Sequence, residues 1–129
     1  MGVHDPTDER ARYVFRVTVR LDPEPGYRAD PDTFETVLSR AADPPGQEGW
    51  LFFRDTLWRG ELGDDAYGRR LAADALGVPA ASVSFSELRT TEAYLDDLKA
   101  AVADDLDAFN ADTVSEVLKK YLGSSIHVV

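Results

Sequence analysis

Apolar side chains occupy every second position from Tyr13 to Leu21, and the positions from Arg12 to Arg20 between them are polar except for Val14. A period of two puts successive side chains on opposite faces of a β-strand, so this segment predicts a strand. Its apolar face carries Tyr13, Phe15, Val17, Val19 and Leu21. The opposite face carries Arg12, Val14, Arg16, Thr18 and Arg20. Three prolines between residues 22 and 31 end the strand and predict a loop.

The next two apolar segments have less regular patterns. Residues 33–42 fit either a strand or a helix capped by Asp32, and a strand is favoured. Residues 50–59 carry apolar side chains at both odd and even positions, which is typical of a central strand covered on both faces. The Pro- and Gly-rich residues 43–49 would join these two strands as a hairpin.

Two delimited segments follow. Asp64 as N-cap and Gly77 as terminator predict a helix between them. Residues 82–89 then alternate small polar side chains with Val83 and Phe85, so they predict another strand.

The C-terminal third reads as helical with a short strand at its end. Thr90 or Thr91 would cap a long amphipathic helix that extends to about Phe109. A capping box at residues 113–116 predicts a shorter second helix. Residues 124–129 predict a final short strand.

The element order is therefore β-β-β-α-β-α-α with a further short strand. This order predicts an α+β fold in which an antiparallel sheet of four to five strands carries helices on one face. Residues 1–11 predict a loose N-terminal tail, and residues 12–129 have the usual length of a single domain.

The charge balance bears on the environment and on partners. The chain has 24 acidic against 14 basic side chains and a net charge of −10. At molar salt the Debye length falls to about 3 Å, so exposed acids hardly repel one another. The surplus of acids predicts a halophilic protein. It disfavours nucleic-acid binding, which weakens as salt rises, without excluding it.

The composition also excludes several classes. The chain has no cysteine, which excludes thiolate metal sites and thiol catalysis. Its first residues lack the apolar run of a signal peptide, and no segment has the length of an apolar membrane span. The sequence therefore predicts a cytoplasmic protein without membrane contact.

The segment GWLFFRDTLWRGEL at residues 49–62 resembles the LWR-salt proteins, a family of small haloarchaeal proteins named for the tripeptide Leu57-Trp58-Arg59. The resemblance extends to the LGVP segment and to the YLGSSIHV tail. It implies a salt-rich archaeal cytoplasm. It implies no activity and no catalytic residue.

One face would combine arginine and aromatic side chains if residues 12–21 and 50–59 share a sheet. That face would carry Arg12, Arg16, Arg20, Trp50, Phe52, Arg54 and Trp58. Such a surface suits a protein partner, a second copy of the chain, or a single-stranded nucleic acid that stacks on the rings. The alternative is a minor core under the C-terminal segment, with the arginines paired to acids such as Glu35.

Arg59 is the second candidate, as an anion or carboxylate ligand beside Gly60. In a regular strand Trp58 and Arg59 point to opposite faces, so they form one surface only where a turn or bulge occurs. The structural alternative is a bridge from Arg59 to Asp55 or to a helix C-terminus.

No motif indicates catalysis, a cofactor or a metal. Neither His4 nor His127 has catalytic or metal-ligand spacing, and residues 105–116 depart from a calcium loop. The favoured hypothesis is a non-enzymatic binding or regulatory module with a protein partner or a homodimer. The alternatives are an RNA or single-stranded nucleic-acid binder that uses the arginine and aromatic face, and a small-molecule sensor or enzyme that uses Arg59.

Overall fold

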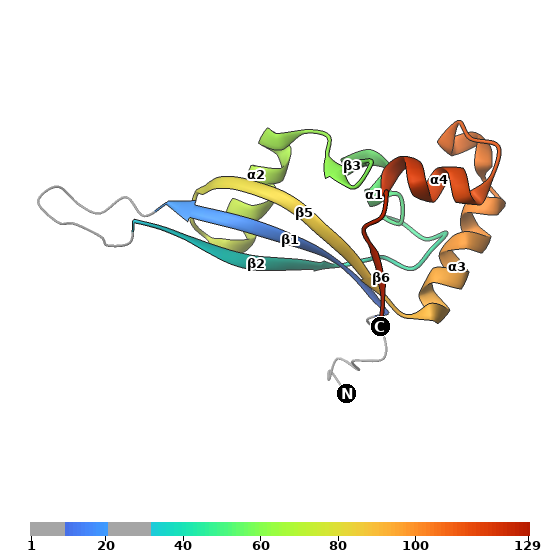
Figure 1. Cartoon of the computed structure of the whole chain (residues 1–129), viewed down its shortest axis with the longest axis horizontal. Helices are drawn as coiled ribbons and strands as arrows, with labels where there is room; N and C mark the ends of the chain where they lie inside the picture. The colour runs from blue at the N-terminus through green and yellow to red at the C-terminus, as the bar shows by residue number, and fades with distance from the viewer. Residues whose placement is uncertain (1–9, 21–31) are drawn as a thin grey trace, which may run out of the picture.

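A four-stranded sheet in the order β2-β1-β5-β6 runs through the structure (Figure 1). The computed structural model describes residues 10–20 and 32–129. The strands are β1 (Ala11–Arg20), β2 (Thr33–Ala41), β5 (Ala80–Thr90) and β6 (Ile126–Val128). β1 pairs antiparallel with β2 and β5, whereas β6 pairs parallel with β5. The sheet is therefore mixed rather than wholly antiparallel as predicted.

The helices cover one face of this sheet, so the predicted α+β class is confirmed (Figure 1). They are α1 (Phe52–Thr56), α2 (Asp65–Leu76), α3 (Glu92–Ala103), the 3-10 helix η2 (Leu106–Phe109) and α4 (Val114–Tyr121). Two further strands, β3 (Leu57–Trp58) and β4 (Glu61–Leu62), form a separate two-stranded ladder. Among the helices of the described residues, none has the length and apolar character that crossing a bilayer requires.

The alternation in β1 decides which face is covered. Tyr13, Phe15, Val17 and Val19 are buried against the helices, as predicted. Phe15 packs edge-on against Phe85 of β5 with ring centroids 5.6 Å apart. The opposite face of β1 carries the arginines and is more exposed, and no helix of the described residues packs over it.

Local signals placed several boundaries correctly. The favoured strand at residues 33–42 is β2. Asp64 accepts a hydrogen bond from the backbone N–H of Tyr67 at 3.1 Å, and Gly77 ends α2 with a φ of 76°. The hydroxyl of Thr113 accepts the N–H of Glu116 in the predicted capping box.

The predicted central strand at residues 50–59 is wrong. The Trp50 N–H donates to the Gln47 carbonyl and the Asp55 N–H to the Leu51 carbonyl, so the chain turns and enters α1. Phe53 is buried within α1, and Leu57, the first residue of β3, is buried directly after it. An apolar run this short fits a buried helix as well as a two-sided strand. The hairpin predicted between residues 33–42 and 50–59 is wrong for the same reason.

The long helix predicted to reach Phe109 is also shorter. α3 ends at Ala103, and Asp104 and Asp105 form a turn before η2. Asn110 then adopts a left-handed φ of 50°, which ends η2 and redirects the chain into α4. Phe109 keeps its buried position although the helix does not reach it.

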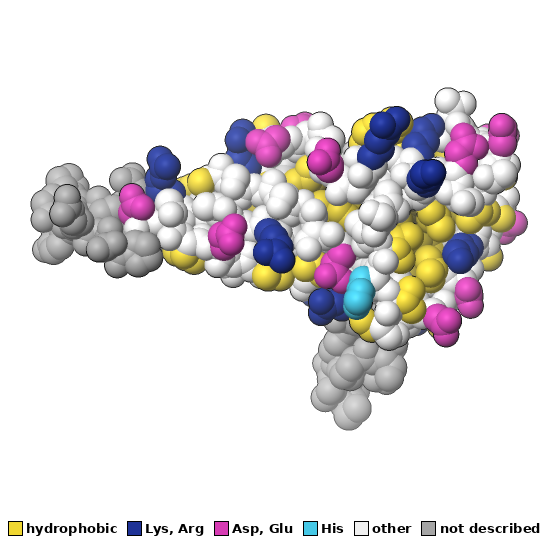
Figure 2. Space-filling model, viewed as in Figure 1, with side chains coloured by type: hydrophobic (Ala, Val, Ile, Leu, Met, Phe, Trp, Pro, Cys, Tyr) yellow, Lys and Arg dark blue, Asp and Glu magenta, His cyan; other side chains and the backbone are white. Residues whose placement is uncertain are grey.

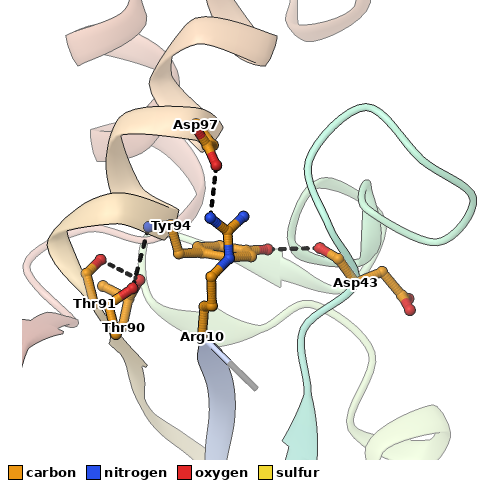
Figure 3. Close-up of polar contacts among 6 residues, drawn as sticks. All are labelled: Arg10, Asp43, Thr90, Thr91, Tyr94 and Asp97. Carbon is orange, nitrogen blue, oxygen red and sulfur yellow. Dashed lines mark hydrogen bonds and ion pairs between the residues drawn. The ribbon is translucent and has the colours of Figure 1, made fainter. Parts of the chain in front are cut away.

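Tyr94, near the start of α3, contacts Arg10 just before β1 and Asp43 just after β2 (Figure 3). Its hydroxyl donates to the Asp43 carbonyl at 2.8 Å, and its N–H is capped by the Thr91 hydroxyl at 3.1 Å. Arg10 stacks over its ring and binds Asp97 at 2.7 Å. Burial raises the pKa of the Tyr94 phenol to about 12, further raised by the Asp43 charge and lowered by Arg10. The Tyr94 phenol is therefore neutral, and its contacts fasten the start of α3 to the ends of β1 and β2.

Some predictions concern residues outside the part of the chain that the structure describes. The loop at residues 22–31 and most of the predicted tail at residues 1–11 lie outside the described residues, as do Leu21 and His4. Ala11, assigned to the tail, instead opens β1.

Candidate functional site

The predicted arginine and aromatic surface does not exist as one face. Arg12, Arg16 and Arg20 do share the uncovered side of β1. Arg12 donates from Nε to the Ser39 hydroxyl of β2 at 2.9 Å, and Arg16 lies opposite Val37. The aromatic residues predicted for this face lie with the helices instead, because residues 50–59 do not enter the sheet.

Trp50, Phe52 and Arg54 stabilise the helical end of the molecule. Trp50 contacts Phe109 with ring centroids 5.8 Å apart, and Phe52 contacts Tyr13 at 4.7 Å. Arg54 binds Asp55 at 2.9 Å and donates to the Ala108 carbonyl at 3.3 Å. These contacts join α1 to β1 and η2.

Trp58 and Arg59 lie in a tight hairpin turn. Trp58 pairs with Glu61, which leaves Arg59 and Gly60 as the two loop residues. Their φ values of 53° and 81° are both positive, as in a type I′ turn. The turn brings the indole and the guanidinium to the same surface, with the Arg59 Cζ atom 5.8 Å from the Trp58 ring centroid.

This turn is docked on the C-terminal end of α4. The Arg59 N–H donates to the Lys120 carbonyl at 2.8 Å, and the Gly60 N–H donates to the Tyr121 carbonyl at 2.9 Å. Carbonyls in the last turn of a helix lack intrahelical partners, so the hairpin caps α4. The predicted bridge from Arg59 to a helix C-terminus is thus made by its backbone, and Asp55 pairs with Arg54 instead.

Gly123 makes the close approach of the turn to α4 feasible, which leads to a first prediction. It has a φ of 60°, and a Cβ atom there would lie 2.9 Å from the Arg59 carbonyl oxygen. We expect Gly123→Ala to cost about 2–3 kcal/mol of unfolding free energy, from left-handed strain and displacement of the turn. Urea unfolding measures this cost. Gly77→Ala is the control, because φ is 76° there but no atom lies within 4 Å of the added Cβ. Equal losses in the two variants would contradict the proposed crowding.

A cationic groove runs beside the turn. Its volume is about 970 Å³, and its lining residues are Trp58, Arg59, Glu116, Lys119, Lys120, Gly123 and Ser124. Trp58 is 47% exposed and meets Tyr121 edge-on at 5.9 Å. The Lys120 Nζ atom lies 5.8 Å from the Trp58 ring centroid. Figure 2 shows the basic side chains gathered over α4 and β3.

Comparison with known proteins identifies the family. Residues 9–129, nearly the whole chain, match the LWR-salt proteins. The chain belongs to the LWR-salt protein family. No curated protein and no solved structure matches it. In this LWR-salt protein the tripeptide consists of a buried Leu57, an exposed Trp58 and the turn residue Arg59.

The groove beside the LWR turn is positively charged within an acidic chain. It combines Arg59, Lys119 and Lys120 with a single acid, Glu116. Within the described part of the chain, Arg59 and Lys119 form no ion pair, whereas Lys120 donates from Nζ to the Phe109 carbonyl at 3.1 Å. The arrangement offers a flat apolar ring flanked by available cations, which suits a ligand with a ring and negative charge.

A metal site is not assembled among the described residues. No group of three His, Asp or Glu side chains in residues 10–20 and 32–129 is arranged to hold a metal ion. His127 lies on the edge strand β6, opposite Arg89 in the register of the sheet.

Sequence reasoning named Trp58 and Arg59 but missed the α4 side of the groove. Lys119 and Lys120 are adjacent in a chain with only three lysines, which was a usable signal. Nothing in the sequence placed α4 against residues 57–62, since that contact is tertiary.

Proposed function

We propose that this LWR-salt protein is a non-enzymatic binding module that holds an anionic, ring-bearing ligand in the groove beside Trp58. The observation that carries the proposal is an exposed indole within 5.8 Å of both Arg59 and Lys120 in a chain of net charge −10. At molar salt only charges within a few ångströms of a ligand act on it, so cations gathered in one groove provide a local site for an anion.

The conformation of Arg59 supports a role for its side chain in binding. Asn-Gly is the preferred sequence of a type I′ turn, and a left-handed conformation costs an ordinary residue about 1–2 kcal/mol. The backbone of Arg59 caps α4, and Asn would preserve that cap. An arginine here adds strain without an ion pair among the described residues, which is typical of functional positions.

The ligand class follows from the two kinds of contact. A ring would stack on Trp58, while phosphate or carboxylate oxygens would lie near Arg59 and Lys119. A nucleotide combines both features. Reversible binding of such a ligand fits a regulatory module or sensor.

Fluorescence of Trp58 tests this proposal directly. Trp50→Phe keeps an aromatic ring at the packed position and leaves Trp58 as the single tryptophan. In molar KCl we expect ATP to quench the indole with saturation, and adenosine or inorganic phosphate to do so at least about tenfold more weakly. No saturable quenching by ATP would contradict the proposal. Tighter binding of single-stranded RNA than of ATP would favour the nucleic-acid hypothesis.

Arg59→Asn separates binding from folding. Asn tolerates a positive φ, so we expect unfolding free energy to stay unchanged or to rise by up to about 1 kcal/mol. Loss of the guanidinium should weaken ATP binding by at least about tenfold. Arg70→Asn is the matched control, because Arg70 also lies over an aromatic ring, that of Tyr67, but outside the groove. A destabilised variant with intact binding would show that Arg59 serves the fold.

The proposal includes the environment and assembly. The net charge of −10 supports work at molar salt in a cytoplasm, with residues 12–129 acting as a single domain. A homodimer also belongs to the proposal. The arginine face of β1 gives little support for it, because that face lacks the aromatic side chains that motivated it.

A further inference from the structure

β2 is an edge strand of the sheet, and the backbone groups on its outer side face away from β1. Within residues 10–20 and 32–129, no element pairs with that edge. β2 is nine residues long, contains no proline, and keeps an unbroken register with β1. Edge strands are normally shortened, bulged or guarded because unpaired backbone groups recruit other strands. β2 is neither shortened nor bulged, and Glu35 is the single charged residue among its outward-facing positions.

The backbone groups on this edge have a symmetric arrangement. The Ala42 N–H donates to the Ala11 carbonyl at 3.0 Å. Antiparallel hydrogen bonding alternates along a strand, so even-numbered residues of β2 bond to β1 and odd-numbered residues face outward. The outward residues are Thr33, Glu35, Val37, Ser39 and Ala41. Val37 lies at their midpoint.

Two exposed apolar side chains lie on the same strand. Val37 is 65% exposed on the uncovered face of the sheet, and Phe34 is 45% exposed on the helix-covered face. Both are large for an exposed edge, and neither is required at the surface for the strand itself to form.

An apolar cleft lies beside this edge, between β2 and α2. Its volume is about 180 Å³. Leu38 and Arg40 line it from β2, and Leu71 and Ala75 line it from α2. The cleft is on the same face of the sheet as Phe34, whose side chain is four residues from Leu38.

We propose that a second copy of the chain pairs with β2 in an antiparallel, two-fold arrangement centred on Val37. In this register Phe34 of one copy lies opposite Arg40 of the other. Phe34 therefore packs at the mouth of the other copy's cleft, and the two-fold repeats the contact. Glu35 lies opposite Ser39, so no like charges face each other directly. All outward residues of β2 find partners.

This pairing supplies the surface for the homodimer in the proposed function, but it does not depend on the groove beside Trp58. The groove is formed by β3 and α4, whereas the interface is formed by β2 and α2. Dimerisation and ATP binding can therefore be measured and lost separately.

Val37→Pro tests the interface in the full chain by light scattering in molar KCl. The Val37 N–H faces outward, so proline leaves the bonds to β1 in place but removes bonds to a second copy. We expect a dimer for the wild type and for the control Val37→Thr, and a folded monomer for Val37→Pro. A wild-type monomer overturns both the homodimer and this interface. A Val37→Pro dimer overturns this interface alone.

Single cysteines test the register, because the chain has none of its own. Residues at the two-fold centre of a hydrogen-bonded pair are about 5.5 Å apart, within disulfide range. Val37→Cys should form a disulfide-linked dimer on mild oxidation. Glu35→Cys, on the same face but away from the axis, should not. Equal cross-linking of both variants overturns the proposed centre.

Phe34→Ala tests the proposed contact between Phe34 of one copy and the cleft of the other. Removal of an anchor that is repeated by symmetry should raise the dimer dissociation constant by at least about thirtyfold. Quenching of Trp58 by ATP should not change. An unchanged dissociation constant overturns the contact between Phe34 and the cleft.

Discussion

Transfer of the protein from molar KCl to a buffer of about 10 mM salt is expected to lower its thermal midpoint by more than about 10 °C. The Debye length grows from about 3 Å to about 30 Å over this change. Two like charges 10 Å apart then repel by about 0.4 kcal/mol in water. A surplus of ten acids makes many such pairs, so their sum reaches several kcal/mol of a stability that is itself small.

The end of α3 is where this repulsion should concentrate. Asp104, Asp105 and Asp107 lie together at the C-terminus of α3 and in η2. Carboxylates at a helix C-terminus are unfavourable because they oppose the helix dipole. Thermal scans by circular dichroism should show that Asp104→Asn with Asp105→Asn recovers part of the loss at low salt and changes little in molar KCl.

Two outcomes would contradict this reading of the charge. A thermal midpoint that is independent of salt would mean that the acids do not limit stability. Recovery by sucrose as well as by KCl would point to excluded-volume or hydration effects instead of screening.

Phe109→Ala is expected to cost about 3–5 kcal/mol of unfolding free energy, the usual loss for a fully buried aromatic ring. Phe109 is 0% exposed and stacks on Phe53 with centroids 5.7 Å apart. Trp50 and Tyr121 contact the same ring at 5.8 and 6.1 Å. The ring therefore joins α1, η2 and α4.

Guanidinium unfolding in molar KCl measures this loss. Tyr67→Ala is the control, since Tyr67 is an exposed ring on α2 and its removal should cost less than about 1 kcal/mol. Phe109→Ala should also red-shift the emission of Trp50, because its indole loses a packed neighbour. A small loss of stability would refute the assignment of Phe109 as a central core residue.

Local signals in the sequence were sufficient for much of the fold. The alternation of residues 12–20 predicted β1 and its buried face, since the period of two is a property of the strand alone. Caps at Asp64 and Thr113 were equally readable, and the cap at Thr91 was one of two adjacent candidates, because a cap bonds a backbone N–H only three residues away.

Features that depend on tertiary contacts were not predictable. Residues 50–59 carry apolar side chains at both odd and even positions, and tertiary packing such as that of Phe53 against Phe109 selects a helical turn over a strand. The sequence also did not determine whether β6 pairs parallel or antiparallel with β5, because a strand of three residues can form either kind of pairing. The long helix stopped early where Asp104 and Asp105 begin a turn.

The sequence predicted some residues of the candidate site but not their arrangement. Trp58 and Arg59 stand out in the sequence, but a turn there lacks the usual Asn-Gly signal, so the two side chains were expected on opposite faces. The cations of α4 reach Trp58 only because the hairpin docks on the C-terminus of that helix. Conversely, the face with Arg12, Arg16 and Arg20 lost its aromatic members with the strand at residues 50–59.

The position of β1 in the sheet sets the order in which the protein can fold. β1 pairs with β2 across a short sequence separation, but Arg12 pairs with Arg89 on its other side. Contacts between such distant residues are slow to form, since a long loop must close before they stabilise the chain. The β1–β2 hairpin therefore has to wait, with one edge of β1 unpaired, until β5 arrives. Refolding on a timescale of about milliseconds to seconds, with the β1–β5 pairing formed after the β1–β2 hairpin, is the kinetic signature expected of this strand order.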